Sequence, residues 1–201
     1  MVLVIGLILL ALGYNLAFYN SDLMVQAVFE FFTQTGSDMF YIIALSLIYL
    51  TFDKKYAKFL IPQFVIQVFF NAGLKDMFQD PRPEWNYING VPIENSYGFP
   101  SGHSQLAVSF WGVQMYMLQN HPKKRFILPV LAIFLVMVPI SRLVIGVHDL
   151  EDVIGGFLIG IGIATLYVFL APEVLSKTQI FSWKSVNIKF FDLHIHPHDT
   201  Q

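Results

Sequence analysis

Apolar runs that are long enough to cross a lipid bilayer take up most of this chain. A transmembrane helix needs about 20 mostly apolar residues, and six runs approach that length: 2–19, 37–53, 56–76, 102–119, 126–147 and 152–171. Charged residues make up only 13% of the 201 residues and hydrophobic residues 55%, whereas a soluble domain carries about 25% charged residues. The sequence therefore predicts an all-α, polytopic membrane protein with six transmembrane helices.

The remaining segments are too short for a second domain. Residues 23–33 are apolar but too few to span, and Glu30 interrupts them, so we expect a short interfacial helix in the first outer loop. We expect one membrane domain over 1–201, with a core at about 1–172 and a cytoplasmic tail at about 173–201. The net charge of −2 gives no reason to expect nucleic acid as a partner, and the absence of cysteine excludes thiol catalysis.

The positive charges sort to one side of this six-span layout. Positively charged loops stay cytoplasmic, so we expect a multi-pass protein of the plasma (inner) membrane with both termini inside. Nine basic residues fall on that side: Lys54, Lys55, Lys58, Lys123, Lys124, Arg125, Lys177, Lys184 and Lys189. The other three, Lys75, Arg82 and Arg142, fall on the outer face. One explanation is that they pair with acids such as Asp76, Asp80 and Glu84. The residues around them in the sequence favour a functional role instead.

Three outer segments, 75–83, 100–103 and 141–152, contain residues suited to phosphoryl transfer. The cations Lys75, Arg82 and Arg142 would stabilise the negative charge of a phosphate in its transition state. Ser101 and Gly102 stand where a helix would begin, and the free N–H groups of a helix N-terminus favour an anion. A plain helix N-cap is the alternative role for Ser101.

His148 and Asp152 are four residues apart, which places them on one face of a helical turn. The carboxylate could then accept a proton from one imidazole nitrogen and leave the other nitrogen as a nucleophile. A second histidine, His103, would protonate the leaving alkoxide. The alternatives are a structural pair of His148 with Asp152 and a helix-start role for His103.

A metal site is a further alternative, with His103, His148, Asp149, Glu151 and Asp152 as ligands. Because three cations directed at the same place would repel a divalent ion, we expect no metal and no other cofactor.

Together these segments resemble the signature motifs of a known family. Lys75-x6-Arg82-Pro83, Pro100-Ser101-Gly102-His103 and Ser141-Arg142-x5-His148-x3-Asp152 are similar, in spacing and order, to the three motifs of the type 2 phosphatidic acid phosphatase (lipid phosphate phosphatase) superfamily. The resemblance implies a six-helix membrane phosphatase that needs no metal and forms a phosphohistidine intermediate. It implies His148 as nucleophile, Asp152 as its orienting partner and His103 as general acid. The phosphate-binding set that it implies is Lys75, Arg82, Ser101, Gly102 and Arg142.

The expected partners are membrane lipids and a lipid phosphate substrate of the phosphatidic acid, phosphatidylglycerol phosphate or polyprenyl diphosphate class. A lipid phosphotransferase that uses the same histidine, and a non-enzymatic binder or transporter of anionic lipids, are the alternatives. The motifs address only the phosphate, so the choice of lipid and the oligomeric state stay open. Gly156 and Gly160 form a small-xxx-small pair that predicts close helix packing. In the tail, His194, His196 and His198 are expected to be solvated.

Overall fold

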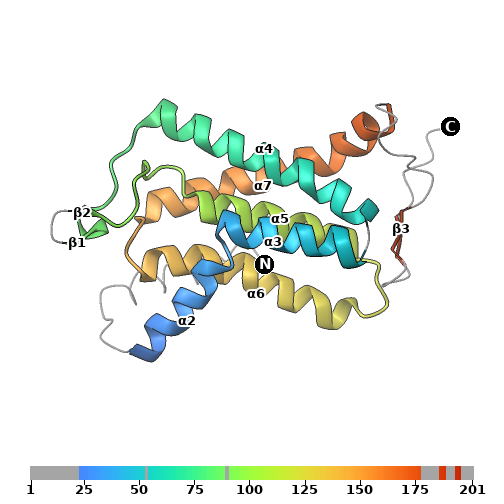
Figure 1. Cartoon of the computed structure of the whole chain (residues 1–201), viewed down its shortest axis with the longest axis horizontal. Coiled ribbons are helices and arrows are strands. Elements are labelled where there is room, and N and C mark those ends of the chain that lie inside the picture. Colours follow the sequence, from blue (N-terminus) through green and yellow to red (C-terminus); the bar gives the residue numbers. More distant parts are fainter. Residues whose placement is uncertain (1–22, 53, 89–90, 178–185, 189–192, 196–201) are drawn as a thin grey trace.

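The computed structural model describes residues 23–52, 54–88, 91–177, 186–188 and 193–195, and these are mostly helical (Figure 1). The helices are α2 (Leu23–Gln34), α3 (Asp38–Leu47), α4 (Lys54–Phe78), α5 (Gly102–Leu118), α6 (Lys124–Val144) and α7 (Leu150–Lys177). A π-helical turn, η1 (Ile48–Phe52), continues α3, and a short 3₁₀ turn, η2 (Glu84–Asn86), lies in the loop after α4.

Two short antiparallel ribbons accompany the helices. In the first, β1 (Tyr87–Ile88) pairs with β2 (Val91–Pro92) in the loop between α4 and α5. In the second, β3 (Val186–Ile188) pairs with β4 (Leu193–Ile195), so that Asn187 lies opposite His194. His196 and His198 lie outside the described residues. The helices therefore define the fold, and the ribbons lie outside their bundle.

Helix α5 occupies the centre of the bundle, with α4, α6 and α7 packed around it (Figure 1). Its first turn is capped by Ser101, whose side chain accepts from the Ser104 amide. Residues on most of its faces are buried, from Ser104 near the site to Leu118 at its other end. A helix that is mostly buried must find partners for its polar side chains within the bundle, and Gln105 and Ser109 of α5 do so through the contacts described below.

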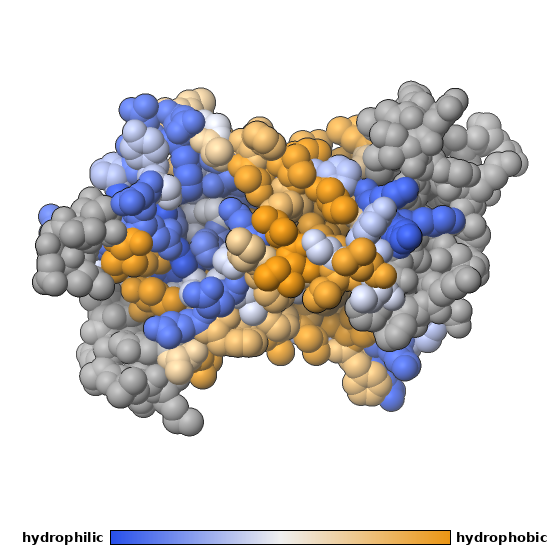
Figure 2. Space-filling view, viewed as in Figure 1, coloured by the Kyte–Doolittle hydropathy of each residue, from blue (hydrophilic) through white to orange (hydrophobic). Residues whose placement is uncertain are grey.

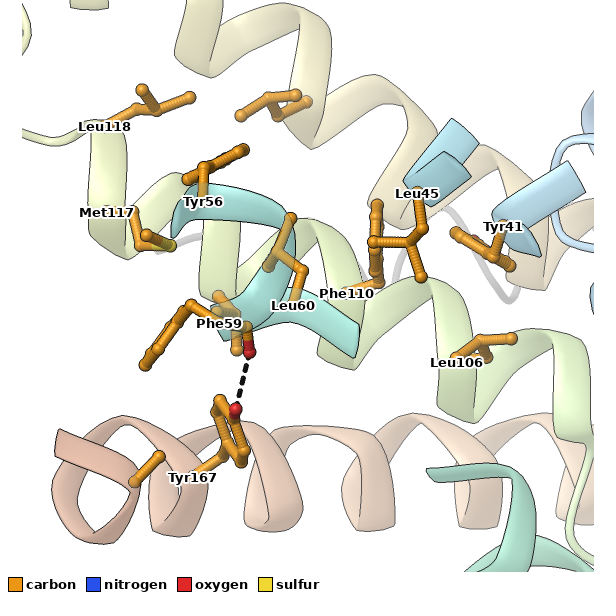
Figure 3. Packing of buried hydrophobic residues seen from close by; sticks show 13 residues of the cluster. Tyr41, Leu45, Tyr56, Phe59, Leu60, Leu106, Phe110, Met117, Leu118 and Tyr167 are labelled. Carbon is orange, nitrogen blue, oxygen red and sulfur yellow. Dashed lines mark hydrogen bonds between the residues drawn. The ribbon is translucent and has the colours of Figure 1, made fainter. Parts of the chain in front are cut away.

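The main apolar core joins α3, α4, α5, α6 and α7 (Figure 3). Tyr41, Leu60 and Phe110 are fully buried in it, and the rings of Tyr41 and Phe110 meet edge to face at 4.7 Å. The hydroxyl of Tyr167 on α7 donates to the carbonyl of Phe59 on α4 at 2.5 Å, the hydrogen bond drawn in Figure 3. This bond lets a tyrosine pack in an apolar layer without an unpaired hydroxyl.

The outer surface of the bundle suits lipid. Figure 2 shows an apolar band across the middle of the molecule, between polar surfaces at its two ends. Leu50, Phe69 and Phe169 are about three-quarters exposed, at 73%, 75% and 76%. Among the described residues, three helices are long and apolar enough to span a membrane: α4, α6 and α7 over Leu150–Ala171. The prediction of an all-α membrane protein is thus confirmed.

The six-span count is supported only in part. The run 102–119 forms a helix of 17 residues, and the run 37–53 forms the shorter α3 with its π-helical turn. The run 2–19 lies outside the described residues, so six spans stay a prediction. A helix does cover 23–33, as expected, and it packs against α6. Helix α7 continues to Lys177, so residues 173–177 are helical although we assigned them to the tail.

The three sequence motifs lie at one end of the bundle. There α4 and α6 end, at Phe78 and Val144, and α5 and α7 begin, at Gly102 and Leu150 (Figure 1). The basic residues at the starts of α4 and α6 lie at the other end. The order of the helices therefore brings the three motifs together, as predicted, although they are far apart in sequence.

Candidate active site

The tight turn between α6 and α7 places His148. Gly146 has a φ of 81°, a left-handed conformation that favours glycine. A Cβ there would also lie 2.8 Å from the Trp85 ring, so the two loops touch at this point. The turn is closed by hydrogen bonds from the Gly146 amide to the Leu143 carbonyl, 3.0 Å, and from the Val147 amide to the Arg142 carbonyl, 3.3 Å. His148 follows, and only 2% of it is exposed.

Both ring nitrogens of His148 have partners that fix its tautomer. Nδ1 lies 2.8 Å from Asp152 Oδ2, and Nε2 lies 3.1 Å from Nη1 of Arg82. A guanidinium can only donate, so Nε2 accepts and the proton is on Nδ1, where it is donated to the carboxylate. Burial, and then the charges of Arg142 and Arg82, lower the pKa of His148 well below its ordinary value. The imidazole is therefore neutral, with the lone pair of Nε2 beside a cation.

Asp152 is held in the first turn of α7. Its amide donates a hydrogen bond to Asp149 Oδ1 at 3.0 Å, which gives Asp149 the helix-capping role that its sequence position did not reveal. The Asp152 carbonyl accepts from the Ser101 amide at 3.0 Å, so the starts of α5 and α7 are joined. The His148–Asp152 pair predicted from the four-residue spacing is confirmed as a contact.

Arg82 is the most extensively hydrogen-bonded cation of the site. Its guanidinium donates to the Ser96 carbonyl at 2.7 Å, to Ser96 Oγ at 2.8 Å and to the Val147 carbonyl at 2.7 Å, and it forms an ion pair with Glu94 at 2.7 Å. Only 4% of its side chain is exposed. These contacts hold one face of the guanidinium against His148.

Arg142 lies deeper, at the end of α6. It is 3% exposed and donates to the hydroxyl of Thr33 on α2 and to Glu94. Its Nε is buried and has no hydrogen-bond partner among the described residues. Arg142 does not line the cavity beside His148; Glu94 stands between the two.

The start of α5 supplies the second motif. Ser101 is fully buried, and its hydroxyl caps the helix and accepts from Ser104 Oγ at 3.0 Å. The capping alternative for Ser101 is thus what the structure shows, and phosphate binding by Ser101 stays a prediction. Gly102 lies so close to Asn71 that a Cβ there would be 2.9 Å from its Oδ1. His103 follows on the cavity side.

Lys75 comes from the last turn of α4. Its ammonium donates to the carbonyls of Tyr97 and, at 3.2 Å, of Gly98. It therefore ties the loop that precedes α5 to the end of α4 while lining the same cavity.

A cavity of about 280 Å³ joins these side chains. Five of the eight predicted site residues line it: Lys75, Arg82, Gly102, His103 and His148. The other three, Ser101, Arg142 and Asp152, lie directly behind it and contact its walls. The structure thus brings the whole predicted set together, although the depth of each residue in the site could not be predicted from the sequence.

Glu94 is the site residue that our sequence analysis missed. It pairs with both Arg82 and Arg142. From the sequence, Asp76, Asp80 and Glu84 were the acids considered as partners of the outer cations. Burial acts to raise the pKa of Glu94, but Arg142 and Arg82 outweigh it and lower the pKa below its ordinary value, so the group is a carboxylate. The only sign of this role in the sequence was that Glu94 is an acid in the same outer loop as Arg82.

A neutral imidazole held by a carboxylate, next to buried guanidinium groups at one end of an apolar bundle, is an arrangement able to bind an anion and to offer a ring nitrogen as a nucleophile. The family model of the PAP2 superfamily matches residues 56–174, which is more than half of the chain and includes all three motifs. The chain belongs to the PAP2 superfamily.

Curated relatives and solved structures agree with this assignment. The chain is 35% identical over 121 residues to phosphatidylglycerophosphatase B of Bacillus subtilis, covering 57% of this chain and 55% of that protein. It is 32% identical over 161 residues to an undecaprenyl-diphosphatase of Sulfolobus acidocaldarius, covering 77% and 75%. Its fold is similar to the crystal structure of the transmembrane PAP2 type phosphatidylglycerolphosphate phosphatase from Bacillus subtilis, with a TM-score of 0.68 at 23% identity over 86% of this chain and 95% of that one.

The match to the curated relatives is partial in length. The chain spans 55% of the Bacillus subtilis protein and 38% of sphingosine-1-phosphate phosphatase 2 of Mus musculus, to which it is 28% identical over 138 residues covering 66% of this chain.

Proposed function

We propose that this protein is a lipid phosphate phosphatase that works through a covalent phosphohistidine. The observation that carries the proposal is the environment of His148, with Asp152 on Nδ1 and Arg82 on Nε2. A neutral imidazole oriented by a carboxylate is an activated nucleophile, and a guanidinium beside its reactive nitrogen attracts the phosphate that it would attack.

In the first step, the Arg82 N–H moves from Nε2 of His148 to a phosphoryl oxygen, and the freed Nε2 lone pair attacks phosphorus. The N–P bond forms while the P–O bond to the lipid breaks, and the leaving oxygen takes a proton from His103. Asp152 stabilises the positive charge that develops on the ring of His148. Lys75 and Arg82 line the cavity and offset the negative charge on the phosphoryl oxygens.

In the second step, His103 accepts a proton from water, whose oxygen attacks phosphorus. The P–O bond forms, the N–P bond breaks, and inorganic phosphate leaves with His148 neutral again. His103 ends protonated, as the first step requires. The bound phosphate supplies the negative charge that stabilises this imidazolium.

The lipid substrate class rests on an apolar groove that leads away from the site. A cavity of about 480 Å³ is lined by one face of α3 and one face of α4. On α4, Phe64 and Val65 line this groove, and Val68 and Ala72 line the site cavity on the same helical face. Ile61 in the groove and Lys75 in the site cavity lie about 21 Å apart along an α-helix. A phosphate at His148 would therefore place an alkyl tail in the groove.

The site is expected at the extracytoplasmic face, because the helix ends that carry most of the basic residues lie at the opposite end of the bundle. The chain has no cysteine, so single cysteines report sidedness directly. A cysteine at the exposed Asn95 should react with an impermeant thiol reagent in intact cells, and one at the exposed Lys123 only after lysis. The reverse pattern would place the site inside.

The activity is tested by phosphate release from purified lipid phosphates in matched micelles. The His148→Ala protein should lose all measurable turnover. His121→Ala, which removes a buried histidine at the other end of the bundle, should retain it. Long-chain substrates should exceed glucose 6-phosphate strongly in kcat/KM, because each buried methylene contributes about 0.8 kcal/mol. Turnover by His148→Ala would refute the covalent mechanism.

Two alternatives are separable in the same assay. A phosphotransferase would pass the phosphoryl group from His148 to an added lipid alcohol, which would appear as a phosphorylated lipid instead of inorganic phosphate. A binder or transporter would need Lys75, Arg82 and Arg142 but would be indifferent to Asp152→Asn.

A further inference from the structure

We propose that Glu94 is an internal anion that occupies the phosphate position of the site and competes with the substrate for its two arginines. This inference rests on the proposed phosphate-binding role of Arg82 and Arg142. It assigns to a residue outside the three motifs a direct part in setting substrate affinity.

The geometry places Glu94 where a phosphate would have to lie. One carboxylate oxygen pairs with Arg82 at 2.7 Å and the other with Arg142. Arg142 is 3% exposed and does not line the cavity, whereas Glu94 does. A phosphate entering from the cavity could reach the Arg142 guanidinium only after Glu94 had moved aside.

Glu94 is able to move because of where it lies. Its side chain is 30% exposed, although both of its arginine partners are almost fully buried. It also lines a second, more open cavity of about 660 Å³ under the outer loop, which shares Lys75, Arg82 and Ser96 with the site cavity. The carboxylate could therefore turn from the arginines into this outer space while remaining solvated.

The exchange keeps an anion beside the two arginines throughout. Two buried guanidinium groups with no anion beside them would incur a large desolvation cost, and Glu94 offsets it. A phosphate that displaces the carboxylate would make the same contacts with the two guanidinium groups and would carry more negative charge. Glu94 thus stabilises the arginines in position and weakens phosphate binding by the free energy of the contacts that are lost.

Orthovanadate, a phosphate mimic, tests this directly. Its affinity is measured by the rise in Tm of the purified protein in detergent and as a competitive inhibition constant. The Glu94→Gln protein should bind orthovanadate about tenfold more tightly, a change of about 1.4 kcal/mol, and its KM for a lipid phosphate should fall. Glu84→Gln is the matched control, since it removes the same charge from an exposed position of the same loop, and it should leave both constants unchanged.

Unchanged or weaker binding of orthovanadate by Glu94→Gln would overturn the inference. If that protein does not fold, the test moves to Asn95→Cys, which retains Glu94 and carries one thiol. Saturating orthovanadate should change the labelling rate of this thiol several-fold, and an unchanged rate would again refute the displacement. Failure of orthovanadate to bind any of these proteins would instead refute the proposed phosphate site, and the role of Glu94 with it.

Discussion

The central helix α5 is joined to two of its neighbours, α7 and α4, in opposite ways. Towards α7 the contact is made by glycines that bring the backbones together. Towards α4 it is made by a row of amide side chains that hydrogen-bond across the interface. Lipid tails are as apolar as leucine, so helices in a membrane associate through close packing and polar contacts and gain little from the hydrophobic effect. This bundle uses one of these means on each side of the same helix.

The α7 side shows how close the backbones come. A Cβ at Gly156 would lie 2.4 Å from the Ser101 carbonyl oxygen, and one at Gly160 would lie 2.6 Å from that of Gln105. The predicted packing role of this glycine pair is confirmed. Because His148 directly precedes α7 and Ser101 caps α5, this contact also sets the distance between the two histidine motifs.

The α4 side is a buried ladder of amides. Asn71 donates to Gln105 at 2.9 Å, Gln105 donates to Gln67 at 2.8 Å, and both Gln67 and Gln63 donate to Ser109. The ladder fixes the register of the helices, because sliding one helix along the other would separate these donors from their acceptors. It begins at the cavity, where Asn71 contacts Gly102, and its contribution to function should decrease with distance from there.

The largest expected effect is from Gly156→Leu. The new side chain would force α7 away from the backbone of α5, at a cost of about 3 kcal/mol from overpacking. Activity should fall about 100-fold or more, since a shift of about 1 Å in a catalytic group costs that much. Tm in detergent and phosphate release measure the two effects. The control is Gly162→Leu on the same helix, where a Cβ meets nothing within 4 Å. Equal losses of Tm and activity in both variants would show that the α7 face packed against α5 is no more sensitive than the open face.

Asn71→Ala should come next. It removes the donors to the Pro100 carbonyl, 3.2 Å, and to Gln105, and it loosens the packing on Gly102. We expect a stability loss of about 1 kcal/mol, as for other interhelical hydrogen bonds in membranes. A fall in kcat/KM of about tenfold is expected, because roughly 1.4 kcal/mol of transition-state stabilisation corresponds to that factor. An unchanged kcat/KM would show that the ladder acts on stability alone.

Gln63→Leu should have a smaller effect, confined to stability. Gln63 Oε1 is buried and has no hydrogen-bond partner among the described residues, so leucine removes an unsatisfied oxygen together with one donor. These changes nearly cancel, and the free energy of unfolding should change by less than about 1 kcal/mol. Activity should be unchanged, because the residue lies more than two helical turns from Asn71. A large loss of activity would mean that the far rungs also position the site.

The smallest effect is expected from Gly162→Ala. The position is exposed and open, and alanine favours a helix over glycine by up to about 1 kcal/mol. Thermal unfolding should show a Tm equal to or slightly above that of the wild type. A clear decrease in Tm would mean that this face of α7 packs closely against something other than the described bundle.

The sequence predicted the features that depend on short spacing and on the alternating direction of the spans. The four-residue interval of His148 and Asp152, and the meeting of three motifs at one bundle end, both follow from helix geometry. Glu94 and the depth of Arg142 could not be predicted in this way, since they depend on how the loop after α4 folds over the site. The Gln63, Gln67 and Gln105 ladder was missed because polar residues within an apolar run give no sign of their partners.

The locked tautomer of His148 has a consequence for isotope effects. With Asp152 on Nδ1 and Arg82 on Nε2, the ring needs no proton rearrangement before it attacks. In the proposed cycle the Nδ1 proton stays in place throughout, and the only proton that moves in each chemical step passes through His103. Turnover in mixtures of light and heavy water should therefore vary linearly with deuterium content, the signature of a single proton in flight.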